Sequence, residues 1–254
     1  MVIQMKKKVK KKLNKKALLV VILVLYLFIM AFYYAFNLPV KLIIVRGNSY
    51  ISDEKIIKSS KIKDDTKLIS LSSKSVIKNI KEIPMIENVK VTKHLNGKIV
   101  LEVSEAAVLY YKALENVYIL ENGNKTSNID IIGIPTLVNY VPSDIEDSYI
   151  KKLKNIDKDI LYKVSEIEYS PDIKDDTIID KNRFLLRMND GNYVYINLAN
   201  INNLNKYDEI YATLDDSSKG VLNLDSSSEN GIVFQTFEFL KKKEAMQNEL
   251  SEGT

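Results

Sequence analysis

The sequence predicts an α+β protein with a single N-terminal transmembrane helix, a compact βααββ domain, and a mixed, mostly antiparallel β domain with flanking helices. Three observations lead to this fold class. An uncharged and almost wholly apolar run fills residues 17–36. Two short segments that begin with helix-capping serines follow it, enclosed by strand-like runs. Further alternating runs, separated by turns of the Asn-Gly and Asp-Gly kind, occupy much of the remaining chain.

The apolar run is long enough to cross a bilayer, because as a helix it would span about 30 Å at 1.5 Å per residue. It extends from Ala17 and Leu18 to Phe36. Positive charge near a membrane span stays on the cytoplasmic side. We therefore expect a basic cytoplasmic tail over residues 1–16, a transmembrane helix over 17–36 and an extracytoplasmic remainder. The lysines of the tail are Lys6, Lys7, Lys8, Lys10, Lys11, Lys12, Lys15 and Lys16.

A cleaved signal peptide is the alternative to a retained anchor. Such a peptide usually has an apolar region of ~7–15 residues and small residues at its cleavage site. Here the apolar run is longer, and the bulky side chains of Phe32, Tyr33 and Tyr34 stand near its end. Because tyrosine favours the membrane interface, the sequence favours an anchor that is retained in a bitopic protein.

Composition excludes several classes of site. The net charge of +4 comes from the N-terminal lysines, and acidic residues outnumber basic ones beyond the apolar run, which disfavours nucleic-acid binding. The chain has no cysteine, so it has no disulfide, thiolate nucleophile or thiolate metal site. His94 is the one histidine, and no zinc site can be built from it without a set of carboxylates. We expect no cofactor.

The pattern of residues 38–106 predicts the βααββ domain. Ser52 and Ser72 are expected to cap its two helices, and Ile51 and Ile56 fit a hydrophobic staple around the first cap. A turn at Asn96-Gly97 is expected to close a β-hairpin. The strands are expected over residues 41–46, 85–94 and 98–105.

The pattern of residues 107–238 predicts the second domain, in which amphipathic helices cover a sheet. One helix is expected after Ser143, with a buried stripe from Ile145 to Val164, and another after Asn200. The polar tail over residues 239–254 is expected to be flexible. Strands are expected over residues 108–113, 117–120, 136–140, 165–169, 184–188, 193–198, 221–224 and 232–236.

No catalytic motif is complete. The Ser-x-x-Lys pattern of serine acyltransferases occurs four times, as expected by chance in a chain rich in serine and lysine, but the Lys-Thr-Gly partner is missing. The acidic pairs lie in segments expected to be loops, and the spaced acidic residues of a calcium-binding loop do not accompany them. The chain also has no glycine-rich phosphate-binding loop. We therefore predict that the protein is not an enzyme and has no catalytic, cofactor-binding or metal-binding residues. The acidic pairs are Asp64-Asp65, Asp175-Asp176 and Asp215-Asp216.

Several segments follow, in order along the chain, the pattern of one known family. LIIVRGNSYIS at residues 42–52 contains a strand, a Gly-Asn turn and a capped helix, and residues 83–93 and 99–105 form the closing hairpin. IPTL at 134–137, SEI at 165–167, the Asp190-Gly191 hairpin and VLNLD at 221–225 follow. Together they resemble the FtsQ/DivIB family of bacterial cell-division proteins, in which a POTRA domain and a β domain follow the membrane anchor.

The resemblance implies a non-enzymatic scaffold of the divisome. Family members join two small bitopic proteins, FtsL and FtsB (DivIC in Gram-positive bacteria), in a complex that helps control septal peptidoglycan synthesis by a penicillin-binding protein. The POTRA domain is implicated in recruitment to the division septum. The last strands of the β domain are implicated in binding a partner strand. The expected location is the cell membrane, enriched at the septum.

The final two strands are the candidate partner-binding site. An exposed terminal strand offers unpaired N–H and C=O groups that a partner strand can satisfy. Ordinary closure of the core is the alternative for apolar residues at such a place. We expect the binding edge to involve Val221, Leu222, Leu224, Val233 and Phe234.

Two other functions remain open. A POTRA-containing scaffold of a secretion or transport system would have channel or barrel partners. A membrane-anchored extracytoplasmic sensor would need a concave pocket with converging polar groups.

Overall fold

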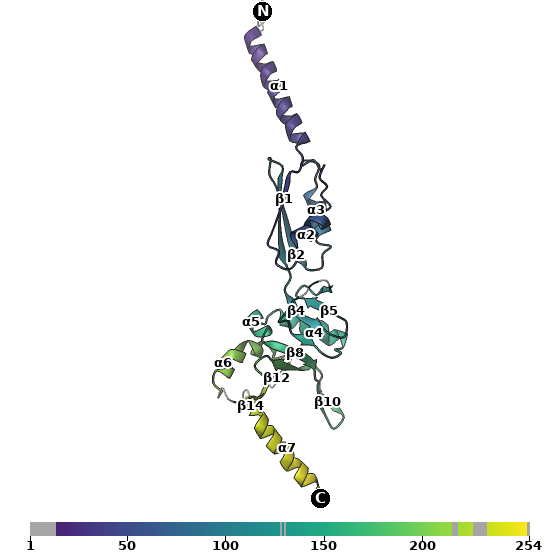
Figure 1. Ribbon diagram of the computed structural model, residues 1–254, viewed down its shortest axis with the longest axis vertical. Coiled ribbons are helices and arrows are strands. Elements are labelled where there is room, and N and C mark those ends of the chain that lie inside the picture. The colour runs from purple at the N-terminus through teal and green to yellow at the C-terminus, as the bar shows by residue number, and fades with distance from the viewer. Residues whose placement is uncertain (1–13, 128, 130, 215–217, 226–232, 253–254) are drawn as a thin grey trace, which may run out of the picture. The chain divides into compact units, whose positions relative to one another are not determined.

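The computed structural model describes residues 14–127, 129, 131–214, 218–225 and 233–252. It divides into two compact units (Figure 1). The first contains the chain up to Glu82 together with Asn88–Val103, and the second contains Ile83–Glu87 together with the chain from Ser104 onward.

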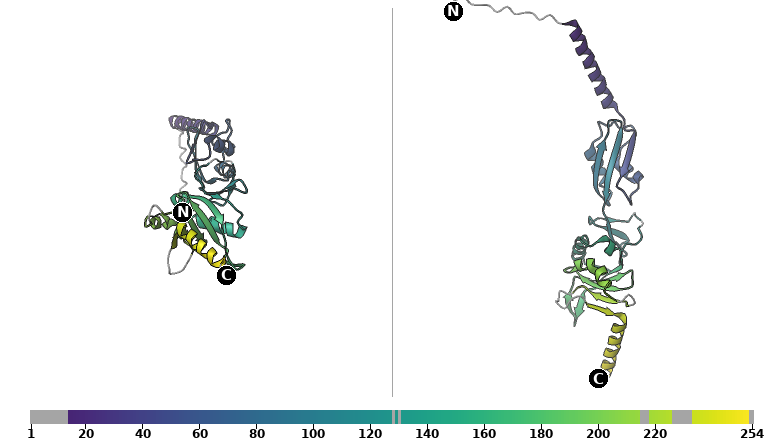
Figure 2. Two further views of the ribbon diagram at one scale, coloured as in Figure 1. Left: turned by 60° about the horizontal axis from the view of Figure 1, so that its bottom comes forward. Right: turned by 90° about the vertical axis from the view of Figure 1, so that its left-hand side faces the viewer.

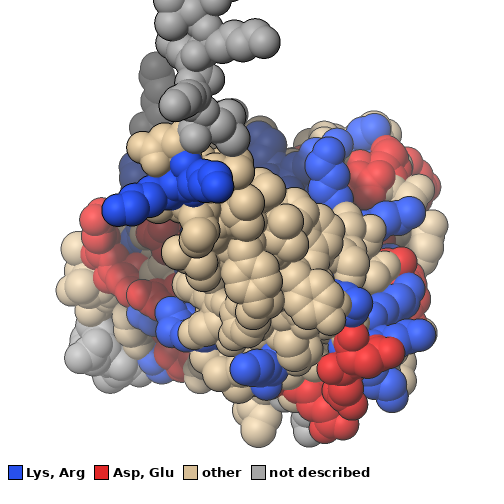
Figure 3. All heavy atoms as spheres, turned by 90° about the horizontal axis from the view of Figure 1, so that it is seen from above, with Lys and Arg blue, Asp and Glu red and all other residues tan. Residues whose placement is uncertain are grey.

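Helix α1 (Lys15–Asn37) is the one helix in the described part of the chain that is long and apolar enough to cross a membrane. Its side chains form a broad uncharged area in Figure 3. The proposed anchor residues Ala17, Leu18 and Phe36 lie in it, and Lys15 and Lys16 form its first turn. The remaining lysines of the expected tail, from Lys6 to Lys12, lie outside the described residues.

The first unit has the predicted βααββ order, with strands β1 (Leu42–Arg46), β2 (Ile86–Lys93) and β3 (Lys98–Glu105) in the sheet order β1-β3-β2. Helices α2 (Asp53–Ser60) and α3 (Ser73–Ile80) lie against one face of the sheet (Figure 1). Both predicted caps are confirmed, because the hydroxyls of Ser52 and Ser72 accept hydrogen bonds from the backbone three residues later. Ile56 of α2 and Ile80 of α3 are fully buried.

A nine-stranded sheet forms the second unit, in the order β14-β13-β12-β11-β8-β7-β4-β5-β6. Most neighbours are antiparallel, while β12/β13, β4/β7 and β7/β8 are parallel. A separate hairpin, β9 (Asp172–Lys174) and β10 (Thr177–Asp180), projects from it. The other strands are β4 (Val108–Lys112), β5 (Val117–Leu120), β6 (Lys125–Thr126), β7 (Thr136–Leu137), β8 (Val164–Tyr169), β11 (Arg183–Met188), β12 (Tyr193–Asn197), β13 (Gly220–Asn223) and β14 (Val233–Thr236).

The core of this unit lies between one face of the sheet and the helices α4 (Ser143–Leu153), α5 (Lys158–Leu161) and α6 (Tyr207–Tyr211) with the 3₁₀ turn η1 (Ile201–Lys206). Tyr149 of α4 stacks on Phe184 of β11 with ring centroids 4.2 Å apart. Stacking of two aromatic rings adds to the free energy gained by burial.

Several expectations differ from the structure. The helix after Ser143 divides into α4 and α5, because a tight turn at Asn155 interrupts it, and Val164 begins β8 instead of ending the helix. The helix after Asn200 begins as the turn η1. The hairpin β9–β10 was missed, since it turns on Asp175 and Asp176, both in the left-handed region at φ 48° and 58°.

The C-terminal segment, expected to be flexible, contains the helix α7 (Phe237–Glu252). Its residues are good helix formers, and Glu238 and Lys242 pair one turn apart at 2.7 Å. The hydroxyl of Thr236 accepts a hydrogen bond from the Phe239 backbone and caps its beginning. The polar composition alone therefore did not distinguish a solvated helix from a flexible tail.

Candidate partner-binding edge

Strand β14 lies at one end of the nine-stranded sheet (Figures 1 and 2). One of its edges pairs with β13, and among the residues that the structure describes no strand pairs with its other edge. The pairing places Val221 opposite Gln235, Leu222 opposite Phe234, and Asn223 opposite Val233. An unpaired edge presents backbone donors and acceptors to solvent or to a partner.

Alternation along β13 and β14 separates the five expected site residues into two groups. Leu222 and Leu224 are only 2% and 1% exposed and belong to the core beneath the helices. Val221 is half-buried, and Val233 is 42% exposed. Their parity along the two strands places them on the opposite face of the sheet. The structure therefore brings the five residues together but turns them to different faces.

Phe234 has an intermediate position. It lies directly opposite Leu222 and packs half-buried against the core. A ring at the last strand of a sheet covers the core where the next strand would otherwise lie. A partner strand placed along β14 would bury the remaining part of this ring.

The beginning of β13 is fixed by a buried polar network around Asn192, which is 1% exposed. Its side-chain oxygen accepts a hydrogen bond from the Gly220 backbone at 3.1 Å, and its amide donates to the Tyr207 hydroxyl at 3.1 Å. That hydroxyl donates to Asp190 at 2.7 Å. Burial, and then the hydrogen bond to Asp190, raise the pKa of Tyr207, so the hydroxyl stays protonated as a donor.

The close approach of the β13 and β14 backbones also fixes the beginning of β13. A Cβ at Gly220 would lie 2.2 Å from the backbone oxygen of Gln235, a distance that no side chain can tolerate without movement of β14. Glycine is therefore required where β13 and β14 first pair.

The end of β13 is fixed by a second polar group. Arg183 pairs with Asp225 at 2.7 Å and covers the ring of Tyr195 at 3.6 Å. The Asp225 carbonyl accepts hydrogen bonds from the side chains of Asn197 and Asn200. Both ends of β13 are thus tied to the rest of the unit.

The face of the sheet away from the helices carries charged and aromatic side chains. Arg187 pairs with Glu166 and, at 3.2 Å, with Glu168, and it lies 5.7 Å above the ring of Tyr193. The hydrogen bond to Glu166 raises the pKa of Arg187. Tyr193 in turn meets Phe237 edge to face, which ties the beginning of α7 to β12.

A buried ion pair between β4 and α4 is the other strong electrostatic feature. Lys112 and Glu146 are 4% and 9% exposed and lie 2.6 Å apart, and the Tyr110 hydroxyl donates to the same carboxylate. Burial lowers the pKa of Lys112, but hydrogen bonds to Glu115 and Glu146 outweigh that effect and raise it overall. With both charges paired, this cluster holds α4 to the sheet and offers no free acid or base.

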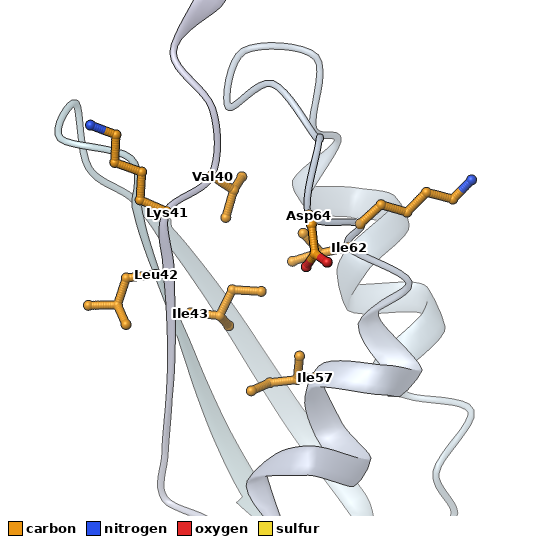
Figure 4. A pocket seen from close by; sticks show the side chains of 8 residues that line it. Val40, Lys41, Leu42, Ile43, Ile57, Ile62 and Asp64 are labelled. Atoms are coloured by element: carbon orange, nitrogen blue, oxygen red, sulfur yellow. The ribbon is translucent and has the colours of Figure 1, made fainter.

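One pocket of about 280 Å³ lies in the first unit, between β1 and the loop after α2 (Figure 4). Val40, Ile43, Ile57 and Ile62 form its apolar walls, and the Asp64 carboxylate points toward it. Apart from that carboxylate and two lysines at the rim, polar groups do not converge there. The described residues also contain no group of three or more side chains able to hold a metal ion.

The sequence missed the residues that position β13. Arg183, Asn192, Tyr207 and Asp225 come from segments far apart in the chain and meet only through the register of the sheet. A buried asparagine after a Gly turn has the same sequence signature as an exposed one. His94 is exposed, as expected for the end of a strand.

The fold and this edge define a class: a protein with a candidate membrane span, a POTRA module and a β domain. Residues 38–106 match the model of the POTRA domain of FtsQ type. The cell division protein DivIB of Brevibacillus brevis is 27% identical over 195 residues, which cover 73% of this chain and 71% of that protein. DivIB of Geobacillus kaustophilus is 30% identical over 194 residues, covering 72% and 71%. The chain belongs to the DivIB family of cell-division proteins.

One solved structure is also similar, the major extracytoplasmic domain of DivIB from Geobacillus stearothermophilus. It is 25% identical and aligns with 46% of this chain and 99% of that domain, with a TM-score of 0.35. Family membership makes the chain a non-enzymatic cell-division protein.

Proposed function

We propose that this protein is a bitopic scaffold of the bacterial divisome. Helix α1 anchors it in the cell membrane, the basic tail of residues 1–16 lies in the cytoplasm, and the remainder lies outside, enriched at the septum. The POTRA domain comprises residues 38–106 and the β domain residues 107–238. The lysines before α1 and the apolar surface of the helix support this orientation.

Through its extracytoplasmic part the scaffold joins FtsL-like and FtsB/DivIC-like bitopic proteins and thereby controls septal peptidoglycan synthesis, in contact with a septal penicillin-binding protein. The single observation that carries this proposal is the outer edge of β14, with which no strand of the described residues pairs. A partner segment adds to it as a tenth strand, so that main-chain hydrogen bonds provide affinity and alternate side chains provide specificity.

The chemistry of the edge defines what that strand must offer. On the helix-covered face it needs an apolar side chain beside Phe234, which is only half-buried. On the opposite face the partner strand meets Val233 and Gln235. The partner residues that point to that face can therefore be small apolar or polar ones. Leu222 and Leu224 support the edge from within the core, and Val221 lies one strand behind it.

The test is photo-cross-linking of the full-length protein in membranes. The chain has no cysteine, so Val233→Cys gives a single site for a thiol-directed photo-cross-linker. The matched control is Ile132→Cys, which is 97% exposed but remote in sequence from the terminal strands. We expect small bitopic proteins cross-linked from residue 233 and absent from residue 132. Recovery of a secretion channel, or equal yields from both sites, contradicts the proposal.

A further inference from the structure

We infer that the end of the first unit nearest α1 docks on phospholipid headgroups. The surface concerned is a juxtamembrane patch formed by Lys41, Lys63, Lys67, Ile69 and Leu95. It goes beyond the partner-binding role of the β domain, and it rests on the proposed membrane anchoring of α1.

Three segments distant in sequence meet at this patch. The linker after α1 pairs with the loop after α2 through a Pro39–Lys67 bridge, with hydrogen bonds from Val40 to Thr66 and from Leu68 to Leu38. The same linker binds the β2–β3 turn, because the Lys41 backbone donates to the Gly97 carbonyl at 2.8 Å.

The turn cannot move away easily, since the linker and the turn are in close backbone contact. Gly97 lies at φ 85°, and a Cβ there would be 2.6 Å from the Pro39 carbonyl. The Lys67 ammonium also donates to the side chain of Asn37, the last residue of α1, at 2.9 Å. The patch is therefore built directly onto the residues that leave the membrane span.

The length of the linker fixes the patch near the bilayer, however the unit is oriented. Lys41 is the fourth residue after Asn37, and an extended chain covers at most ~14 Å over that length. The headgroup region extends about 5–8 Å beyond the hydrocarbon core. The ammonium groups of Lys41 and Lys67 thus lie within reach of phosphate oxygens.

The composition of the patch fits an anionic membrane surface. Leu95, at the tip of the β2–β3 turn, is 85% exposed, and Ile69 in the neighbouring loop is 51% exposed. Two apolar tips beside exposed lysines match the way that peripheral proteins insert side chains between headgroups while cations bind phosphate. The three lysines outnumber the two exposed acids of the loop, Asp64 and Asp65, and the Asp64 carboxylate points toward the pocket (Figure 4), so the patch keeps a net positive charge.

The test uses full-length protein reconstituted in vesicles of phosphatidylcholine with 30% phosphatidylglycerol, compared with phosphatidylcholine alone. Leu95→Cys carries an environment-sensitive fluorophore, and the matched control is Glu54→Cys, an exposed position in the first turn of α2 beyond the far end of β1. Quenching by lipids with brominated acyl chains is expected to be at least twofold stronger at residue 95 than at residue 54. It is also expected to be stronger with phosphatidylglycerol and to decrease as salt is raised.

A second comparison separates charge from position. Lys41→Gln/Lys63→Gln/Lys67→Gln removes the lysines of the patch, whereas Lys55→Gln/Lys58→Gln/Lys78→Gln removes three exposed lysines of α2 and α3. Only the first variant is expected to halve the quenching at residue 95. Equal quenching at residues 95 and 54, or equal effects of both triple variants, overturns the inference. A chain that does not float with vesicles contradicts the anchor as well, whereas a chain that floats with residue 95 in water contradicts the docking alone.

Discussion

Strands β13 and β14 pair with each other over four residues, yet the unit holds them in different ways. Strand β13 lies between two neighbours, contributes Leu222 to the core, and is tied at its beginning by Asn192 and after its end by Arg183. Strand β14 has one neighbouring strand within the described part of the chain and exposes Val233. Of these two adjacent apolar strands, β13 therefore supports the fold and β14 presents an edge.

The largest effect is expected from a charge at Leu224, the buried residue that directly follows the supporting strand β13. Leu224→Asp buries a carboxylate among apolar side chains, so we expect it to lower the free energy of unfolding of the second unit by at least about 4 kcal/mol. Circular dichroism during thermal unfolding of the full-length protein measures the loss. A variant that folds normally but no longer binds partners would contradict the assignment of Leu224 to the core.

The second prediction concerns the polar tie at the beginning of β13. Asn192→Ala leaves the buried Gly220 N–H without its acceptor, and we expect a loss of about 1–3 kcal/mol. Urea unfolding measures it, with the exposed Asn202→Ala as the control. If both variants have the same stability, the network around Asn192 does not fix β13.

The elements that depend on local sequence could be predicted from the sequence. Local signals predicted α1, the capped helices α2 and α3, and the hairpins at Asn96-Gly97 and Asp190-Gly191, because caps, periodicity and turn residues act over a few positions. They located the terminal strands as well. The order of strands in the second sheet depends on pairings between distant segments, which local patterns do not encode.

The site residues illustrate the same limit. Val221 and Leu222 are neighbours and both apolar, so alternation alone did not decide which of them faces the core. The parallel register with β12 decides it, since Leu222 lies beside Val194 and Val221 beside Tyr193. Asn192 and Arg183 could not be found for the same reason, because their roles arise only when β11, β12 and β13 are in register.

The third prediction loosens the pairing of the two strands at the buried Gly220. Gly220→Ala places a methyl group against the Gln235 carbonyl, so β14 must move. We expect the free energy of unfolding to fall by about 1–3 kcal/mol. Hydrogen exchange is the measurement. Amides of β14 are expected to lose protection while those of β11 keep it, and uniform loss across the sheet would show that β14 is part of the supporting core.

The smallest effect on stability is expected in the presented strand itself. Val233→Asp changes an exposed side chain outside the core, so the free energy of unfolding should change by no more than about 0.5 kcal/mol. Partner capture by the full-length protein should nevertheless fall at least tenfold, because a carboxylate at the edge would be desolvated without a partner when a strand is added. Ile132→Asp is the matched control and should leave capture unchanged. If Val233→Asp instead unfolds the unit, the division between a supporting and a presenting strand is wrong, and the partner must bind elsewhere on the β domain.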